Sequence, residues 1–282
     1  MNTGTPGGTG LPSQPGRSLA TQDDRVRIRP GAHAGARWTA FLLTFAAAWW
    51  ALDRLTTSPP RPATALGALA AAAAILAIGE RFLLGQPWRR VPHVLGLGRP
   101  AWRACLLSAG VGGAVIASYA AGAALLGIDL QLRPHWPAVL IAVLLFHGLA
   151  EELVWRGFVF GHLRRTRTFW RAVGWSVPLI ALTHIPILIG NDWVVALLAV
   201  VSAAVTCLPL AYLWERGGHT MWAPAILHGL IGTWQLWERT YPAEFSIVVV
   251  AVSILVPLSV FLFGARVLTG KDRGTGSPAL SR

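Results

Sequence analysis

Eight apolar runs, most of them long enough to cross a bilayer as a helix, dominate this sequence. They lie near 62–84, 101–128, 137–160, 172–190, 193–214, 220–237 and 245–268, with a shorter run at 38–52. A transmembrane helix needs about 20 mostly apolar residues, and inside lipid each backbone polar group must be bonded within the protein. The sequence therefore predicts an all-α fold: a polytopic integral membrane helix bundle with about eight transmembrane helices.

The composition agrees with a chain whose main solvent is lipid. Of 282 residues, 54% are apolar and only 13% are charged, which leaves little polar side-chain surface for a water-soluble protein of this size. The two ends differ, because they are rich in polar residues, Gly and Pro and cannot bury much apolar surface. We expect disordered cytoplasmic tails at 1–36 and 270–282, flanking a transmembrane domain at 37–269 whose functional core spans about 137–236.

Basic residues are distributed very unevenly between alternate hydrophilic segments. One alternate set, which includes both termini, holds 19 of the 24 basic residues, and the opposite set holds 4. The positive-inside rule then predicts a multi-pass protein of the cell membrane with both termini in the cytoplasm. Because the basic residues lie between apolar runs, anionic lipids are the expected partners and nucleic acid is not. The preference for Arg over Lys and the many Ala residues suggest a bacterial gene.

Two acids and a base share the run at 137–160, where each charge is costly at bilayer depth. Glu152 and Arg156 are four residues apart, so an α-helix places them on one face in the favourable Glu-before-Arg order. Glu151 points about 100° away from Glu152. We expect Arg156 to neutralise Glu152 and leave Glu151 free to act.

Two histidines in other runs lie at a similar depth. His184 and His228 are 13 and 12 residues from the nearest arginine expected on the cytoplasmic side, and Glu151 is likewise 13 residues from its own. At about 1.5 Å per residue these offsets correspond to about 18 to 20 Å. A shared polar centre requires such a match in depth, whereas a single intramembrane histidine is more often structural. His147, one turn before Glu151, is interpreted as a helix-to-helix hydrogen bond.

These residues resemble the motifs of the CPBP, or Abi, family of intramembrane proteases, which includes CAAX prenyl proteases. The matched positions are, in order, Glu151, Glu152, Arg156 and Gly157, then Ile180 and His184, then His228 and Gly232. Two positions depart from the family pattern: Ile180 stands where phenylalanine is usual, and Gly232 stands where the family has Asn or Asp. Thr233, Gln235 or His147 could supply the missing polar group, but on an ideal helix Gln235 points about 60° away from Gly232.

The resemblance implies an intramembrane endopeptidase that acts on a membrane-associated protein or peptide. Glu151 would be the general base that activates water, Glu152 and Arg156 would shape it, and His184 and His228 would position water or stabilise the oxyanion. We expect no cofactor, because no compact metal motif is present. Zinc remains the alternative, with Glu151, His184 and His228 as its ligands.

Two other functions fit the same residues. A non-catalytic membrane scaffold, or an immunity-type partner binder, could retain the polar centre for packing. A proton-coupled transporter could use intramembrane Glu and His as a relay. The two halves of many transporters repeat each other in sequence, and no such repeat is visible between the two halves of this sequence.

Overall fold

A computed structural model describes Met1 and residues 34–185, 193–238 and 243–268. In chain order the helical elements are α1 Ala34–Leu55, α2 Pro62–Ile78, η1 Gly79–Leu83, η2 Trp88–Arg90, α3 Val91–Val94, α4 Trp102–Leu125, α5 Trp136–Val143, η3 Leu144–Ala150, η4 Leu153–Phe160, α6 Gly161–Arg164, α7 Phe169–Thr183, α9 Trp193–Arg216, α10 Trp222–Ile231, η5 Gly232–Leu236 and α11 Ala243–Leu268. Within the described ranges no strand forms, and the β-pairing is one isolated bridge, between Leu132 and Trp237.

The predicted all-α membrane helix bundle is confirmed. Five helical spans in the described ranges are long and apolar enough to cross a membrane: Pro62–Leu83, Trp102–Leu125, Trp136–Arg164, Leu197–Arg216 and Glu244–Leu268. The expected number of eight stays a prediction, because α1, α7 and α10 do not meet the same criteria of length and hydropathy.

Some boundaries differ from those expected. α1 begins at Ala34, inside the tail expected at 1–36, and the rest of that tail, like 270–282, lies outside the described residues. Within the run at 172–190, α7 ends at Thr183 with His184 as its C-cap, and residues 186–190 lie outside the described residues. The short helical turns at 88–94, rich in Arg, were not predicted.

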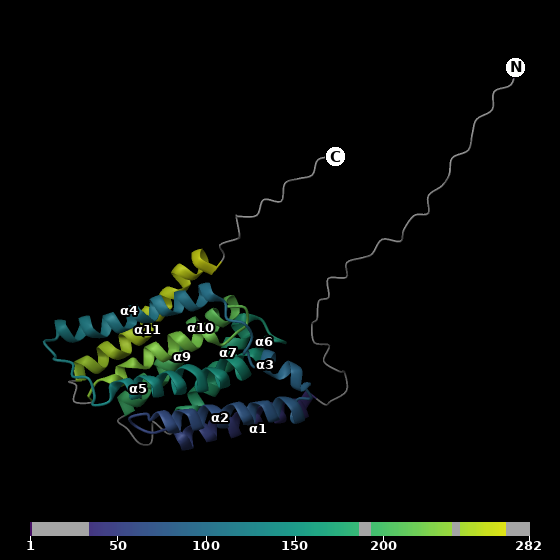
Figure 1. Cartoon of the computed structure of the whole chain (residues 1–282), viewed down its shortest axis with the longest axis horizontal. Coiled ribbons are helices and arrows are strands. Elements are labelled where there is room, and N and C mark those ends of the chain that lie inside the picture. The colour runs from purple at the N-terminus through teal and green to yellow at the C-terminus, as the bar shows by residue number, and fades with distance from the viewer. Residues whose placement is uncertain (2–33, 186–192, 239–242, 269–282) are drawn as a thin grey trace. The chain divides into compact units, whose positions relative to one another are not determined.

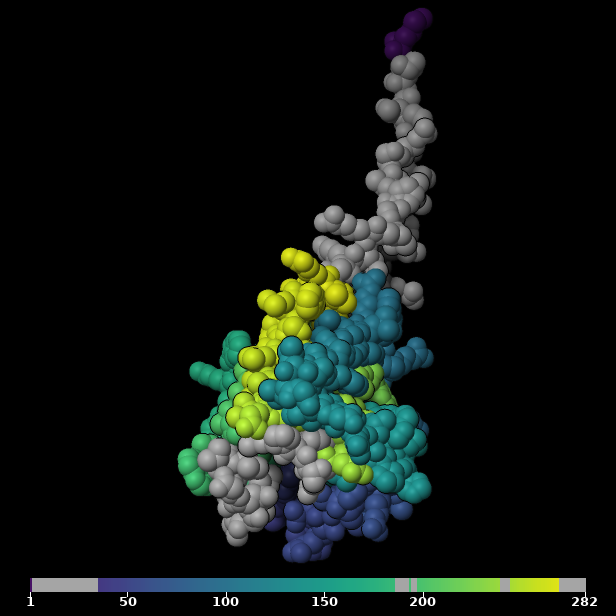
Figure 2. All heavy atoms as spheres, turned by 90° about the vertical axis from the view of Figure 1, so that its left-hand side faces the viewer, coloured from purple at the N-terminus to yellow at the C-terminus, as the bar shows by residue number. Residues whose placement is uncertain are grey.

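The helices pack side by side along a common direction (Figure 1). α1 pairs with α2, and α4 pairs with α11, while the Trp136–Arg164 span contacts α2, α7, α9 and α10. Figure 2 shows the atoms of α11 next to those of α4. The span that carries both glutamates is therefore enclosed by helices from both halves of the chain.

Two large hydrophobic clusters form most of the core in the described part of the chain, beside a small third one of Val139, Val143 and Leu236. The first joins α1 and α2 to the central span and α7; the second joins α4 to α9, α10 and α11. α10 contributes to both, through Ala225 to the first and Leu227 to the second. Large apolar side chains also remain exposed on the outer faces, among them Leu66, Leu106, Leu255 and Leu262. Such extensive exposed apolar surface is expected where helices face lipid.

The central span is not a regular α-helix. Two π-helical stretches, Leu144–Ala150 and Leu153–Phe160, flank a short link that consists of Glu151 and Glu152. A π-turn inserts an extra residue into the helix, so side chains depart from the regular 100° spacing, and such turns are frequent at functional sites. The directions of the two glutamate side chains therefore cannot be taken from an ideal α-helix and are given by the structure.

Two glycines let α10 approach the central span closely. A Cβ atom at Gly148 would lie 2.9 Å from the Ala225 carbonyl oxygen, and one at Gly229 would lie 2.8 Å from Leu144 Cδ2 of the central span. Only glycine allows two backbones this close. The contact lies beside His228 in α10 and three residues before Glu151 in the span, so it sets the distance between these two side chains.

Candidate functional site

The two adjacent glutamates lie in different environments. Glu152 is fully buried, and its Oε1 accepts a hydrogen bond from Arg156 Nη1 at 2.8 Å. Arg156 is 4% exposed and also donates to the Cys207 carbonyl oxygen of α9 at 3.4 Å. The Glu151 side chain keeps 14% exposure. The predicted pairing of Glu152 with Arg156 is present, and Glu151 is the carboxylate that other molecules can reach.

His228 of α10 lies between the two carboxylates. Its Nδ1 is 2.7 Å from Glu152 Oε1, and its Nε2 is 3.6 Å from Glu151 Oε2. Glu152 Oε1 already accepts from the Arg156 guanidinium, and a carboxylate oxygen accepts, so His228 donates to it through Nδ1. Its Nε2 is then directed at Glu151. The similar depth expected for Glu151 and His228 is matched by this contact.

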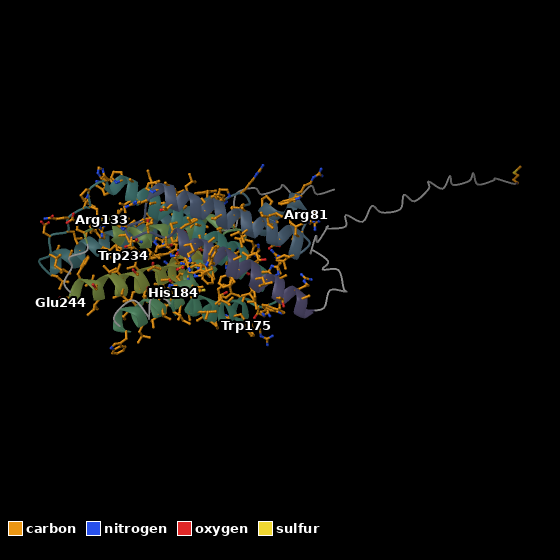
Figure 3. All side chains as sticks on the ribbon, turned by 90° about the horizontal axis from the view of Figure 1, so that it is seen from below. Arg81, Arg133, Trp175, His184, Trp234 and Glu244 are labelled. Atoms are coloured by element: carbon orange, nitrogen blue, oxygen red, sulfur yellow. The ribbon has the colours of Figure 1, made fainter. Side chains whose placement is uncertain are left out.

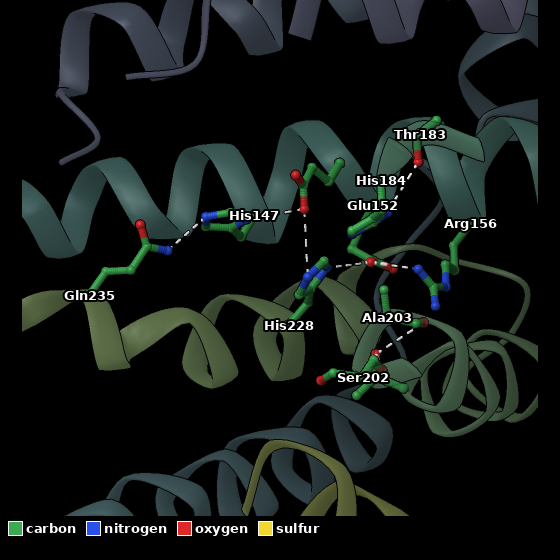
Figure 4. A network of polar contacts seen from close by, with 11 residues as sticks. His147, Glu152, Arg156, Thr183, His184, Ser202, Ala203, His228 and Gln235 are labelled. Atoms are coloured by element: carbon green, nitrogen blue, oxygen red, sulfur yellow. Dashed lines mark hydrogen bonds and ion pairs between the residues drawn. The ribbon is translucent and has the colours of Figure 1, made fainter. Parts of the chain in front are cut away.

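His147 forms the other side of the site. Its Nδ1 lies 3.1 Å from Glu151 Oε2 within the same span, and its Nε2 lies 2.8 Å from Gln235 Nε2 of η5. The contacts form a series from Gln235 through His147, Glu151 and His228 to Glu152 and Arg156, drawn as dashed lines in Figure 4. His147 is thus more than the helix-to-helix contact expected, since it also bonds Glu151.

His184 stands apart from these contacts. Its Nδ1 is 2.8 Å from the Ile180 carbonyl oxygen, to which it donates, and Thr183 Oγ1 lies 3.3 Å away from the same nitrogen. Figure 4 draws His184 and Thr183 with the network. Among the hydrogen bonds and ion pairs of the described residues, none joins His184 to Glu151, Glu152 or His228. With Nδ1 used by its own helix, His184 has Nε2 left for a ligand or water.

Gly232, the position at which the family has Asn or Asp, faces His147. A Cβ atom added at Gly232 would lie 3.4 Å from His147 Cδ2. The segment Gly232–Leu236 is a 3₁₀-helix, in which residues three apart eclipse one another, so Gln235 takes up the direction of Gly232. The 60° offset expected from an ideal α-helix is therefore removed by the local distortion. Thr233 donates to the Leu230 carbonyl oxygen of its own helix instead.

The 3₁₀ segment is held in place from outside the site. Arg133 Nε donates to the Gln235 carbonyl oxygen at 2.9 Å, and Arg133 N donates to the Leu236 carbonyl oxygen at 2.8 Å. These contacts fix the backbone that carries the Gln235 side chain. In Figure 3 Arg81 and Arg133 lie at opposite ends of the bundle, with His184 between them.

A metal ion would fit three of these residues. His147, Glu151 and His228 each offer a ligand atom, and the atoms lie within 4.8 Å of one another. The other ring nitrogen of His228 contacts the Glu152 carboxylate, which is how outer residues orient metal-binding histidines. His184, expected as a ligand, is not in this group, and His147 takes its place.

The fold and the site together define a class of protein. It is a helical membrane bundle that encloses carboxylates and imidazoles from separate helices. Residues 133–234, from the segment before α5 into η5, match the model of the family described as Rce1-like, type II CAAX prenyl endopeptidase. The match confirms the resemblance to the CAAX-protease family over residues 133–234. No curated protein and no solved structure matches the chain.

Two residues of the site, His147 and Gln235, were considered from the sequence as replacements for the polar group missing at Gly232, and their contacts were not predicted. The spacing of four residues between His147 and Glu151 was a usable signal, because side chains four apart on a helix are neighbours. The contact with Gln235 had no such signal. It depends on the 3₁₀ geometry of η5 and on the close packing of α10 against the central span.

Proposed function

We propose that this protein is an intramembrane endopeptidase that hydrolyses a peptide bond with a water molecule activated by Glu151. The observation that carries the proposal is the contact of Glu151 with two imidazoles from different helices, His147 at 3.1 Å and His228 at 3.6 Å, beside a fully buried Glu152–Arg156 pair. The family match at 133–234 supports the same reaction class.

The reaction follows from the positions of the polar atoms. Glu151 is 14% exposed, so it can bind a water that approaches the substrate carbonyl. As the water oxygen bonds to the carbonyl carbon, Glu151 takes its proton and later passes it to the leaving amine as the carbon–nitrogen bond breaks. The negative charge that develops on the carbonyl oxygen needs donors at the right place.

We assign the support of this charge to the histidines. His228 carries a proton on Nδ1 toward Glu152, so Nε2 is the ring nitrogen that faces Glu151 and the reacting groups. A doubly protonated His228 donates to the oxyanion from Nε2. His184, whose Nδ1 is used by its own helix, offers Nε2 to hold the attacking water. If the site held a zinc ion, that ion would polarise the water or the carbonyl as a Lewis acid.

Mass spectrometry of intact small membrane proteins and released peptides tests the proposal. Cells that express the wild-type chain are compared with cells that express Glu151→Gln, and the candidate substrate is then incubated with each purified protein in liposomes. Glu215→Gln is the matched control, because it makes the same change in a partly exposed ion pair with Arg164 outside the site. We expect cleavage by wild type and Glu215→Gln only; full cleavage by Glu151→Gln would refute the assignment.

The membrane orientation is part of the proposal. We infer that both termini lie in the cytoplasm, because 19 basic residues fall on that side of the predicted topology. Arg81 is one of the 19 basic residues expected on the cytoplasmic side, and Arg133 is one of the 4 expected on the other side. Their positions at opposite ends of the bundle support this topology (Figure 3). Anionic lipids are then the expected contacts of the basic end.

A proton-coupled transporter is the second candidate. The unbroken series of contacts from Gln235 to Arg156 favours it, because linked Glu and His side chains can also relay protons. The liposome assay separates the two functions. Flux that Glu151→Gln abolishes, with no peptide released by wild type, would favour transport.

A non-catalytic scaffold is separated by a second assay. In cells with a deletion phenotype, the double variant Glu151→Ala/His184→Ala is compared with wild type. A peptidase requires that the double variant fail to complement the deletion, whereas a scaffold would allow it to do so.

A further inference from the structure

The hydrogen-bonding roles along the chain of contacts depend on a side chain outside the matched motifs. Gln235 turns its amide nitrogen toward His147 Nε2, at 2.8 Å. An amide nitrogen only donates, so His147 Nε2 must be the acceptor and carry no proton. A neutral His147 then holds its proton on Nδ1, the atom that faces Glu151 Oε2 at 3.1 Å.

We propose that Gln235 is a positioning residue, which fixes the tautomer and ring orientation of His147 so that His147 donates to Glu151. The inference deepens the proposed function and rests on it for its activity readout.

The local structure gives Gln235 little alternative. Its backbone is held by Arg133, whose Nε donates to its carbonyl oxygen at 2.9 Å, and the 3₁₀ turn aims its side chain in the direction of Gly232. Gly232 carries no side chain that would crowd His147, since a Cβ atom there would lie 3.0 Å from Val143 Cγ1 and 3.4 Å from His147 Cδ2. Glycine at 232 and glutamine at 235 therefore act together.

The two histidines that face Glu151 are held by opposite kinds of partner. His228 meets the Glu152 carboxylate, which only accepts, so its Nδ1 must donate away from Glu151. His147 meets an amide donor, so its remaining proton is directed at Glu151. Glu151 Oε2 thus receives one fixed N–H donor from its own span. This donor holds the carboxylate in one orientation in which it can accept a proton from water.

Histidine-selective ¹⁵N NMR of the purified full chain in detergent micelles tests the tautomer directly. The His147 signals are assigned by their loss in His147→Asn. We expect wild type to carry the proton on Nδ1. The isosteric variant Gln235→Glu presents only acceptors when ionised, so we expect it to move the proton to Nε2. A wild-type proton on Nε2, or an unchanged tautomer in Gln235→Glu, would overturn the proposal.

Kinetics supply the second readout. We expect Gln235→Ala to lower kcat by about tenfold, the effect of losing one orienting hydrogen bond, while KM stays within about twofold. Gln131→Ala is the matched control: it makes the same change at an exposed side chain nearby, and the main-chain contact of Gln131 with Glu238 remains. An equal kcat in Gln235→Ala and wild type would refute the positioning role.

The two readouts keep the inference and the proposed function apart. If the NMR signals respond as expected but no variant, wild type included, cleaves any peptide, the tautomer assignment stands and the peptidase assignment fails. If wild type cleaves and the NMR signals do not respond, the peptidase assignment stands and the role of Gln235 is refuted.

Discussion

Replacing Glu152 by glutamine should lower the stability of the protein more than the same replacement of Glu151, although the two residues are adjacent. Glu152 is 0% exposed and Arg156 is 4% exposed, so Glu152→Gln leaves a guanidinium buried without its counter-charge. Breaking a buried ion pair in this way costs about 3 to 5 kcal/mol. Glu151 is 14% exposed, and its nearest partner is a histidine, so its neutral isostere should cost about 1 kcal/mol or less.

Thermal unfolding in detergent, followed with a thiol-reactive fluorescent dye, measures the difference. Cys207 is 2% exposed and lies next to the ion pair, so its thiol becomes reactive when this part of the core opens. For a chain of this size, a loss of 3 to 5 kcal/mol corresponds to a lower midpoint by about 10 °C. We expect this shift in Glu152→Gln and a shift of about 2 °C in Glu151→Gln.

Two further variants check the physical reason. Glu152→Gln/Arg156→Met removes both charges and should recover most of the lost stability, because no charge is then left buried alone. Glu215→Gln breaks a pair whose side chains are 31% and 22% exposed, and should cost less than about 1 kcal/mol. Equal midpoints for Glu152→Gln and Glu151→Gln, or no recovery in the double variant, would refute the reasoning.

Further changes test the packing and the chemistry around the site. Gly148→Ala should cost about 1 to 3 kcal/mol and lower activity, because the added Cβ atom would lie 2.9 Å from the Ala225 carbonyl oxygen. Gly113→Ala, whose added Cβ atom would have nothing within 4 Å, should not destabilise the protein. Equal thermal unfolding midpoints for the two variants would argue against the close contact. Tyr119→Phe should cost about 1 to 3 kcal/mol by leaving the Ile231 carbonyl oxygen without the 3.0 Å bond that Tyr119 Oη donates, which chemical unfolding can measure. Cleavage should persist in an excess of a zinc chelator, in line with the metal-free expectation; loss of activity that added zinc restores would instead favour an ion bound by the site.

The sequence could predict those features that depend on neighbours along the chain. Apolar runs of sufficient length can satisfy their backbone in lipid only as helices, which decided the fold class. The four-residue spacing decided the pairing of Glu152 with Arg156, because that spacing stacks side chains even where the helix departs from regularity. The similar depth of Glu151 and His228 also followed from counting residues, since the rise per residue is nearly constant.

Only the tertiary structure decided which side chains meet across helices. Whether Gln235 or Thr233 reaches His147 depends on a 3₁₀ turn that Arg133 holds from another segment, and this rotation cannot be deduced from periodicity. The separate position of His184 follows from the end of α7 at Thr183 and from the bond to Ile180, not from depth alone. Length and periodicity fix how deep a residue lies, but the direction of its side chain toward another helix depends on how closely the backbones pack and where each helix changes its pitch.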